Sequence, residues 1–113
     1  MITIWHNPRC SKSRQTLALL EKHASGVNIR RYLEDAPSLD EIRTTHEMLG
    51  GPLVKMIRTG ETVFKELSLS KSDPDNALLA AMAAHPILIE RPIVFANGTA
   101  AIGRPPESVL SIL

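Results

Sequence analysis

Short apolar runs and amphipathic stretches alternate along the chain and predict a small α/β fold. An apolar run at residues 2–5 predicts a buried strand. Residues 11–23 place apolar side chains on one face of a helix that Gly26 is expected to end. A second strand is expected over residues 28–33, where apolar and polar positions alternate less regularly. The chain is therefore expected to begin with a strand, a helix and a strand.

Helix signals dominate the middle of the chain. Residues 38–41 read Ser-Leu-Asp-Glu, the pattern of a capping box, and predict the start of a helix that the later Gly-Gly pair ends. Pro52 suits the first turn of a short helix that reaches residue 57 or 58. Residues 73–74, Asp-Pro, predict a further helix to residue 85, with Asp as N-cap and Pro in the first turn.

The last part of the chain predicts a hairpin and a final helix. Residues 97–98, Asn-Gly, lie between the apolar runs 92–96 and 99–102, which indicates a two-residue β-turn. Residues 105–107, Pro-Pro-Glu, are expected to open a last helix. The whole order predicts an α/β sandwich on a small mixed four-stranded sheet flanked by helices, in one domain over residues 1–113.

Composition and charge exclude several classes of protein. The net charge is +1, and one Trp, one Tyr and two Phe leave little for stacking on bases, so nucleic-acid binding is not expected. No stretch approaches the ~18 apolar residues of a membrane-spanning helix, and no charged segment precedes the first apolar run as in a signal peptide. One cysteine and dispersed histidines give no metal-ligand spacing. A lone cysteine fits a reducing compartment, so we expect a cytoplasmic protein, monomeric by default.

Cys10, the only cysteine, lies between the first strand and the first turn of the first helix. The unpaired amides and the dipole of a helix N-terminus stabilise a thiolate, and Arg9, Lys12 and Arg14 stand within four residues of it. Such surroundings lower a thiol pKa from about 8.5 into roughly the 3.5–7.5 range. The alternative is a buried cysteine that packs as a small hydrophobic residue. The polar and cationic neighbours favour the reactive thiolate.

Ser13 stands where a Cys-x-x-Cys redox motif has its second cysteine. Because this chain cannot close an internal disulfide, an external thiol must resolve any oxidised or substrate-bound form of Cys10. A cysteine phosphatase of the low-molecular-weight kind needs an arginine six positions after its cysteine. Thr16 stands there, so that interpretation fails.

Five segments of the chain form a longer pattern: HNPRCSKSRQTL at 6–17, YLE at 32–34, MIR at 56–58, HPILIERPIV at 85–94 and GRPPE at 103–107. Together and in this order they resemble the glutaredoxin-coupled arsenate reductases, over essentially the whole chain. The resemblance implies a thioredoxin-like fold, with a helical insertion, for this sequence.

Three arginines fall on the family's anion-binding positions: Arg58, Arg91 and Arg104. Guanidinium forks bind the oxygens of a tetrahedral oxyanion in pairs, with more geometric specificity than lysine. Each arginine also has a plainer alternative. Arg58 could be a solvated helix end, Arg91 a turn residue, and Arg104 a partner of Glu107.

The resemblance implies further roles around the thiol. Cys10 is then the nucleophile, and His6 helps to tune its thiol. Pro92 is expected to be the cis-proline whose preceding residue faces the cysteine in thioredoxin-like folds. Ser13 and Arg14 are candidate substrate contacts, and Arg14 could equally hold a glutathione carboxylate or pair with a nearby acid.

The function that the resemblance implies is reduction of arsenate to arsenite, with glutathione as co-substrate, glutaredoxin as partner and no bound cofactor. Residues 11–12, Ser-Lys, depart from the family's common Gly-Thr, and the chain lacks the C-terminal extension of the better-known members. Both features fit a short subgroup of the family. Two alternatives stay open: a glutathione-linked monothiol reductase of another substrate, and a non-catalytic regulator that binds RNA polymerase. Ser13 breaks the Cys-x-x-Cys switch of the redox-sensing regulators.

Overall fold

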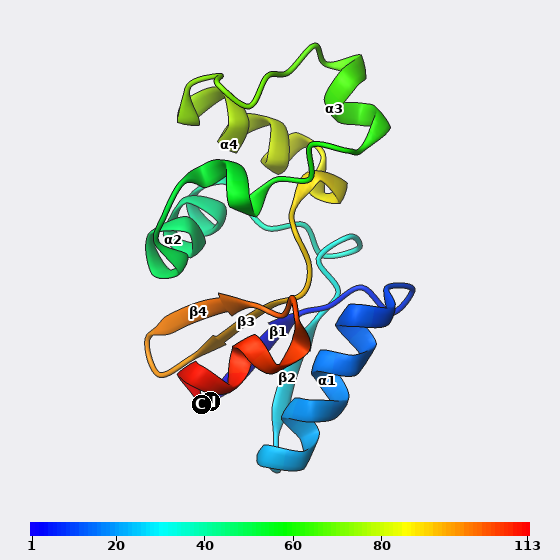
Figure 1. Cartoon of the computed structure of the whole chain (residues 1–113), viewed down its shortest axis with the longest axis vertical. Coiled ribbons are helices and arrows are strands. Elements are labelled where there is room, and N and C mark those ends of the chain that lie inside the picture. Colours follow the sequence, from blue (N-terminus) through cyan, green and yellow to red (C-terminus); the bar gives the residue numbers. More distant parts are fainter. The chain divides into compact units, whose positions relative to one another are not determined.

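The computed structural model describes residues 1–113 and contains two compact units. Unit 1 combines Met1–Asp35 with Arg91–Leu113, and unit 2 is the intervening segment Ala36–Glu90 (Figure 1). The expectation of one domain over residues 1–113 stays a prediction beside this division. No helix in either unit has the length and apolar character needed to cross a membrane.

Unit 1 carries a mixed four-stranded sheet, as the sequence predicts. Its strands are β1 (Ile2–Trp5), β2 (Val27–Arg30), β3 (Ile93–Ala96) and β4 (Thr99–Ile102). They lie in the order β2-β1-β3-β4, with β1 parallel to β2 and antiparallel to β3, and with β3 antiparallel to β4. The hairpin prediction is confirmed, because β3 and β4 pair across Asn97 and Gly98, which both have positive φ. Strands β2 and β4 are the sheet edges (Figure 1).

The second strand is shorter than predicted. A strand was expected over residues 28–33, but β2 ends at Arg30. The carbonyl of Arg31 accepts the N–H groups of Glu34 and Asp35 over 3.0 and 2.8 Å, which folds the chain into a turn. These local hydrogen bonds compete with strand pairing and end the strand.

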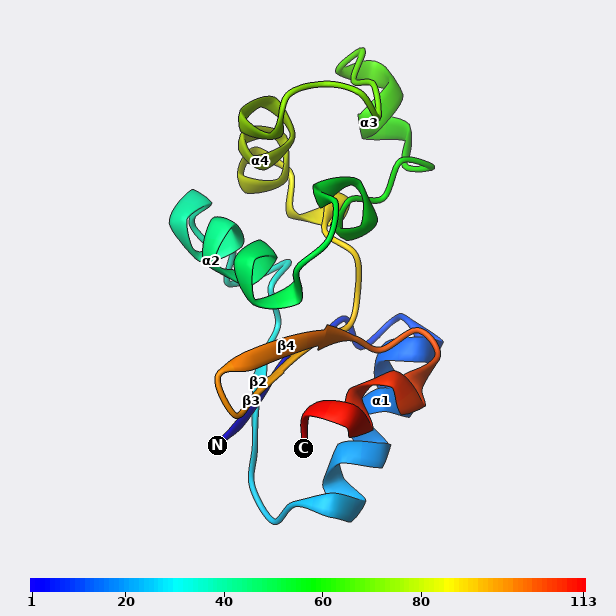
Figure 2. The same cartoon turned by 60° about the vertical axis from the view of Figure 1, so that its left-hand side comes forward.

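Helix α1 (Ser11–His23) and the 3-10 helix η3 (Pro106–Ile112) lie on the same face of this sheet (Figures 1 and 2). The core between them is a cluster of fully buried side chains from both helices and the two central strands: Ile4, Leu20, Val94 and Val109. Burying each of these side chains stabilises the fold by about 1.5–3 kcal/mol. Through Leu20, this cluster packs the second half of α1 against the sheet.

Two details of these helices differ from the expectations. The bounds of α1 are confirmed at residues 11–23. The residue that ends the helix is the C-cap Ala24, which has an extended backbone, and not Gly26 as expected. The last helix begins where Pro105 and Pro106 predict it, yet it winds as a 3-10 helix. Sequence periodicity over so short a segment does not separate the two helix types.

Unit 2 is built from helices, in agreement with the predicted insertion. Its elements are α2 (Leu39–Leu49), η1 (Leu53–Met56), α3 (Thr62–Glu66), α4 (Asp75–Ala84) and η2 (Pro86–Leu88), of which η1 and η2 are 3-10 helices. The capping box is confirmed: the Glu41 N–H donates to Ser38 Oγ over 3.1 Å, and the Ser38 N–H donates to Glu41 Oε1 over 2.9 Å.

Three details of unit 2 correct the sequence predictions. Helix α4 begins one residue later than expected, with Pro74 at its N-cap, and the Asp73 carboxylate instead accepts the N–H of Ser70 over 2.9 Å. Pro52 precedes η1 as its N-cap, and this short element ends at Met56. Helix α3 was not predicted, because five residues are too few to show a helical period.

Gly103 joins three elements of unit 1 at close range. Its N–H donates to the Pro92 carbonyl over 2.9 Å. A Cβ on Gly103 would lie 2.6 Å from Thr16 Oγ1 and 2.8 Å from Pro92 Cγ, both shorter than van der Waals contact. Because Thr16 belongs to α1 and Pro92 precedes β3, glycine lets the end of β4 approach both.

We predict that Gly103→Ala destabilises the protein by about 1–3 kcal/mol, the usual cost of overpacking a filled site. The free energy of unfolding in urea measures this effect. Gly26→Ala is the matched control, since no atom lies within 4 Å of a Cβ built there. Equal stability of the two variants would show that the contacts of Gly103 relax freely.

Candidate active site

Cys10 is held at the junction between β1 and α1. The Cys10 N–H donates to the Asn7 carbonyl over 3.0 Å, and the Cys10 carbonyl accepts the Arg14 N–H over 3.0 Å as the first bond of the helix. The Asn7 side chain shapes the same turn, because its Oδ1 accepts the Arg9 N–H over 3.0 Å. The cysteine is thus the N-cap residue of α1, as the sequence predicts.

The surroundings of Cys10 favour its thiolate. Burial raises the pKa of the thiol, but the backbone N–H groups of Ser13 and Lys12 and the charges of Arg91 and Arg104 outweigh it, so that the pKa is lowered overall. A thiolate is a stronger hydrogen-bond acceptor than a thiol, so these N–H groups stabilise the anion more than the neutral form.

Two of the three predicted arginines come from the far end of the chain to Cys10. Arg104 Nη2 lies 3.6 Å from Cys10 Sγ, and Arg104 Nε donates to the Arg91 carbonyl over 2.8 Å. The Nε and Nη1 atoms of Arg91 are buried. The peptide bond between Arg91 and Pro92 is cis, which confirms the expectation for Pro92. The role of these two arginines in anion binding stays a prediction, beside the plainer alternatives of a turn for Arg91 and a pair with Glu107 for Arg104.

His6 is linked to the cysteine loop through Ser13. His6 Nδ1 lies 2.7 Å from Ser13 Oγ, which also accepts the Asn7 N–H over 3.0 Å. Burial lowers the pKa of His6, and the charges of Arg31 and Arg14 lower it further, so the ring is neutral at neutral pH. Ser13 is fully buried. Its hydroxyl thus ties the end of β1 to the helix start, while its N–H faces the sulfur.

The contacts of the two remaining candidates, Arg14 and Arg58, are with groups of their own units. Arg14 is exposed and its Nη1 donates to the Pro8 carbonyl over 2.9 Å, so it also braces the loop. Arg58 lies in unit 2, where its guanidinium pairs with Glu61 and lies 3.9 Å from Glu90 Oε1. Its role in anion binding stays a prediction, as do the substrate contacts of Arg14 and Ser13.

Sequence reasoning missed the part that Arg31 plays near this site. Arg31 falls within the strand expected over residues 28–33 and was not singled out there, yet its charge acts on His6. The parallel register pairs Trp5 with Arg30, so His6 and Arg31 are the next residues along the two strands. A prediction of how the first two strands pair, residue by residue, would have placed Arg31 beside His6.

The assembled site can supply a nucleophile and bind an anion. A buried thiolate beside two guanidinium groups can attack an electrophilic centre while the arginines neutralise oxygen atoms on it. No group of three or more His, Cys, Asp or Glu side chains is placed to hold a metal ion. The residues around Cys10 thus combine a nucleophilic sulfur with positively charged side chains.

Comparison with known proteins gives consistent matches over the whole chain. Residues 5–112 match the ArsC family. A protein of Neisseria meningitidis named arsenate reductase is 46% identical, over 99% of this chain and 97% of that protein. One of Haemophilus influenzae with the same name is also 46% identical, over 99% of this chain and 98% of its own. A solved structure titled arsenate reductase from Vibrio cholerae is 50% identical, with a TM-score of 0.94, over 99% of this chain and 97% of that one. This structural likeness confirms the thioredoxin-like fold class.

We predict that Arg104→Ala shifts the alkylation of Cys10 to higher pH. Removing the charge beside the sulfur raises the pKa of the thiol, so less thiolate is present at any given pH below it. The rate of reaction with iodoacetamide, measured from pH 4 to 9, reports this pKa. Arg43→Ala is the control, because Arg43 is an exposed arginine that pairs with Asp40 in unit 2. An unchanged pH profile in Arg104→Ala would contradict the electrostatic account.

Proposed function

The chain belongs to the ArsC family, and on that premise we propose that it reduces arsenate to arsenite through Cys10. The observation that carries this proposal is Arg104 Nη2 at 3.6 Å from the Cys10 sulfur, beside Arg91, whose Nε and Nη1 atoms are buried. A thiolate flanked by guanidinium groups suits an oxyanion substrate, since it combines the nucleophile with its counter-charges. Relatives that carry the name arsenate reductase support the choice of arsenate among oxyanions.

Arsenate binding follows from the charges of the site. At neutral pH arsenate is a tetrahedral oxyanion with up to two negative charges, which repels a thiolate. The positive charges of Arg91 and Arg104 offset this repulsion, and each guanidinium group can donate two hydrogen bonds to a pair of arsenate oxygens. Arg58 is the third proposed arginine. Its guanidinium now pairs with the carboxylates of Glu61 and Glu90, and an arsenate oxygen is an anionic acceptor of the same kind that can take their place. Arg14 and the Ser13 N–H complete the proposed anion contacts.

The proposed chemistry proceeds in two steps whose atoms and electrons balance. The Cys10 thiolate attacks arsenic, a sulfur–arsenic bond forms, and one arsenate oxygen leaves as water after protonation. Glutathione then attacks the Cys10 sulfur as a thiolate, and the electron pair of the sulfur–arsenic bond stays on arsenic. Arsenic is reduced from the +5 to the +3 state and leaves as arsenite. The two thiols are oxidised together to a Cys10–glutathione disulfide.

Release of the enzyme from this disulfide needs a second external thiol. The chain has one cysteine and Ser13 at the resolving position, so it cannot expel glutathione by itself. We propose glutaredoxin, whose thiolate attacks the glutathione sulfur and frees the Cys10 thiolate. A reducing compartment keeps this cycle running, so the proposed location is the cytoplasm, and the proposed working unit is a monomer without a bound cofactor.

We predict arsenate-dependent oxidation of NADPH when the protein is coupled to glutathione, glutaredoxin and glutathione reductase. Cys10→Ser abolishes this turnover because the nucleophile is lost. Arg91→Ala and Arg104→Ala raise the KM for arsenate between about ten- and a hundredfold, since each loses charged hydrogen bonds of about 1.5–3 kcal/mol. Arg43→Ala, with its charge in unit 2 paired to Asp40, keeps wild-type kinetics.

Other outcomes of the same assay identify the alternative functions. Turnover of glutathionylated substrates without arsenate, insensitive to Arg58→Ala, would identify a monothiol reductase of another substrate. No turnover with any oxyanion, together with capture of RNA polymerase by the purified protein, would identify a regulator. Normal affinity for arsenate in both arginine variants would contradict the proposed anion site.

A further inference from the structure

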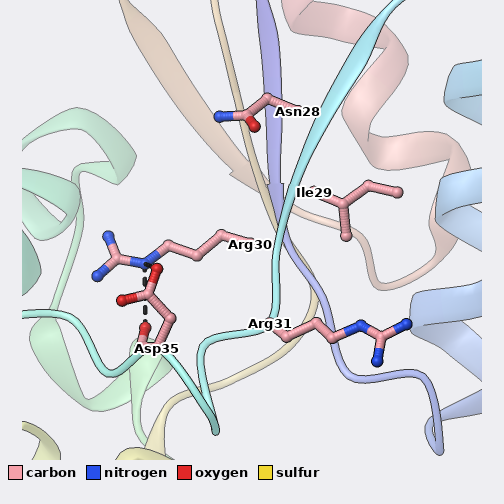
Figure 3. Close-up of a pocket in the computed structure, with 5 residues that line it drawn as sticks. All are labelled: Asn28, Ile29, Arg30, Arg31 and Asp35. Carbon is pink, nitrogen blue, oxygen red and sulfur yellow. Dashed lines mark hydrogen bonds and ion pairs between the residues drawn. The ribbon is translucent and has the colours of Figure 1, made fainter.

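A pocket of about 500 Å³ lies along the edge strand β2 (Figure 3). Its lining residues come from the strand and from the turn that follows: Asn28, Ile29, Arg30, Arg31 and Asp35. This volume falls in the range of pockets that bind small molecules. Figure 3 shows Asn28 and Arg30 on one side of the strand and Ile29 and Arg31 on the other, as strand alternation requires.

The strand offers backbone groups to this pocket. The His6 N–H donates to the Arg30 carbonyl over 2.8 Å, so the backbone of Arg30 faces β1. Because successive residues of a strand point their N–H and C=O groups to opposite sides, the backbone of Ile29 faces the open edge. The Ile29 side chain is also 44% exposed. An extended peptide can therefore pair with the edge and cover this side chain.

The two arginines of the pocket differ in the groups that their side chains contact. Arg30 Nε donates to the Asp35 carbonyl over 3.1 Å and lies 3.3 Å from its carboxylate, and the guanidinium stacks 5.6 Å from the Trp5 ring centroid. Arg31 is exposed and points to the opposite side of the strand, away from Asp35 (Figure 3). The Asp35 side chain is 76% exposed. The pocket thus presents the cation of Arg31 and the exposed carboxylate of Asp35, which Arg30 pairs with, on two sides of one open strand edge.

This pocket is connected to the cysteine loop. Strands β1 and β2 are parallel, so both end at the same side of the sheet, where β1 leads into the Cys10 loop. The charge of Arg31 acts on His6, which lies 2.7 Å from Ser13 Oγ. The His6 N–H also donates to the Arg30 carbonyl over 2.8 Å, so hydrogen bonds of His6 join the strand of the pocket to Ser13 in the Cys10 loop.

We propose that the β2 pocket binds glutathione, with its peptide groups along Ile29, a carboxylate on Arg31 and its ammonium group toward Asp35. Glutathione is a short peptide with two carboxylates, one ammonium group and amides, which matches this set of groups. The inference rests on the proposed function for the identity of the thiol and adds where that thiol binds. It makes Arg31 a binding residue, separate from the arginines that hold arsenate.

S-methylglutathione tests this site, because it keeps every recognition group and cannot form a disulfide. We expect saturable shifts of the backbone amide signals of residues 27–31 in ¹⁵N NMR titrations of the full chain. Arg31→Glu weakens this binding at least tenfold through charge reversal, Arg31→Lys restores part of it, and Arg43→Ala leaves it unchanged. No saturable shift at residues 27–31, or equal binding by Arg31→Glu, would overturn the proposal.

Steady-state kinetics separate this proposal from the proposed function. If both hold, Arg31→Glu raises the KM for glutathione at least fivefold, with a much smaller change in the KM for arsenate. Normal arsenate turnover with an unchanged KM for glutathione in Arg31→Glu would overturn the pocket and leave the function standing. Binding of S-methylglutathione that depends on Arg31, in a protein without arsenate turnover, would support the pocket and overturn the function.

Discussion

The negative charge of the Cys10 thiolate is the constraint on which the rest of unit 1 depends. Burial opposes that charge, and it is stabilised only because two kinds of positive group converge on the sulfur. The N–H groups of Ser13 and Lys12 come from the first turn of α1, next in sequence. Arg91 and Arg104 come from the other end of the chain, and folding brings Arg104 Nη2 to 3.6 Å from the sulfur.

The fold meets this requirement with close backbone contacts. The Gly103 N–H bonds to the Pro92 carbonyl, and the missing Cβ of Gly103 lets β4 approach α1 at Thr16. Arg104 follows at once and bonds through its Nε to the Arg91 carbonyl. A side chain at Gly103 would displace the arginine as well as the strand.

Local sequence signals predicted much of this arrangement, and long-range contacts account for the rest. The bounds of α1, the hairpin turn and the capping box at Ser38 follow from neighbouring residues, so their patterns were sufficient. The family resemblance predicted Arg91 and Arg104, which no local pattern could bring to Cys10. The end of β2 and the neighbourhood of Arg31 depend on a turn and on strand register, which periodicity does not encode. The helix α3 and the 3-10 geometry of η3 were not predicted, because both segments are too short to show a helical period in the sequence.

The most direct test of the account is the covalent state of Cys10 after a single turnover. The protein is incubated with arsenate and glutathione, without glutaredoxin, and its mass and the arsenite released are measured. The account predicts one glutathionyl group on Cys10 and one arsenite per chain, with neither product when arsenate is left out. Arsenite that accumulates over many turnovers without glutaredoxin, or a Cys10 that stays unmodified, would contradict it.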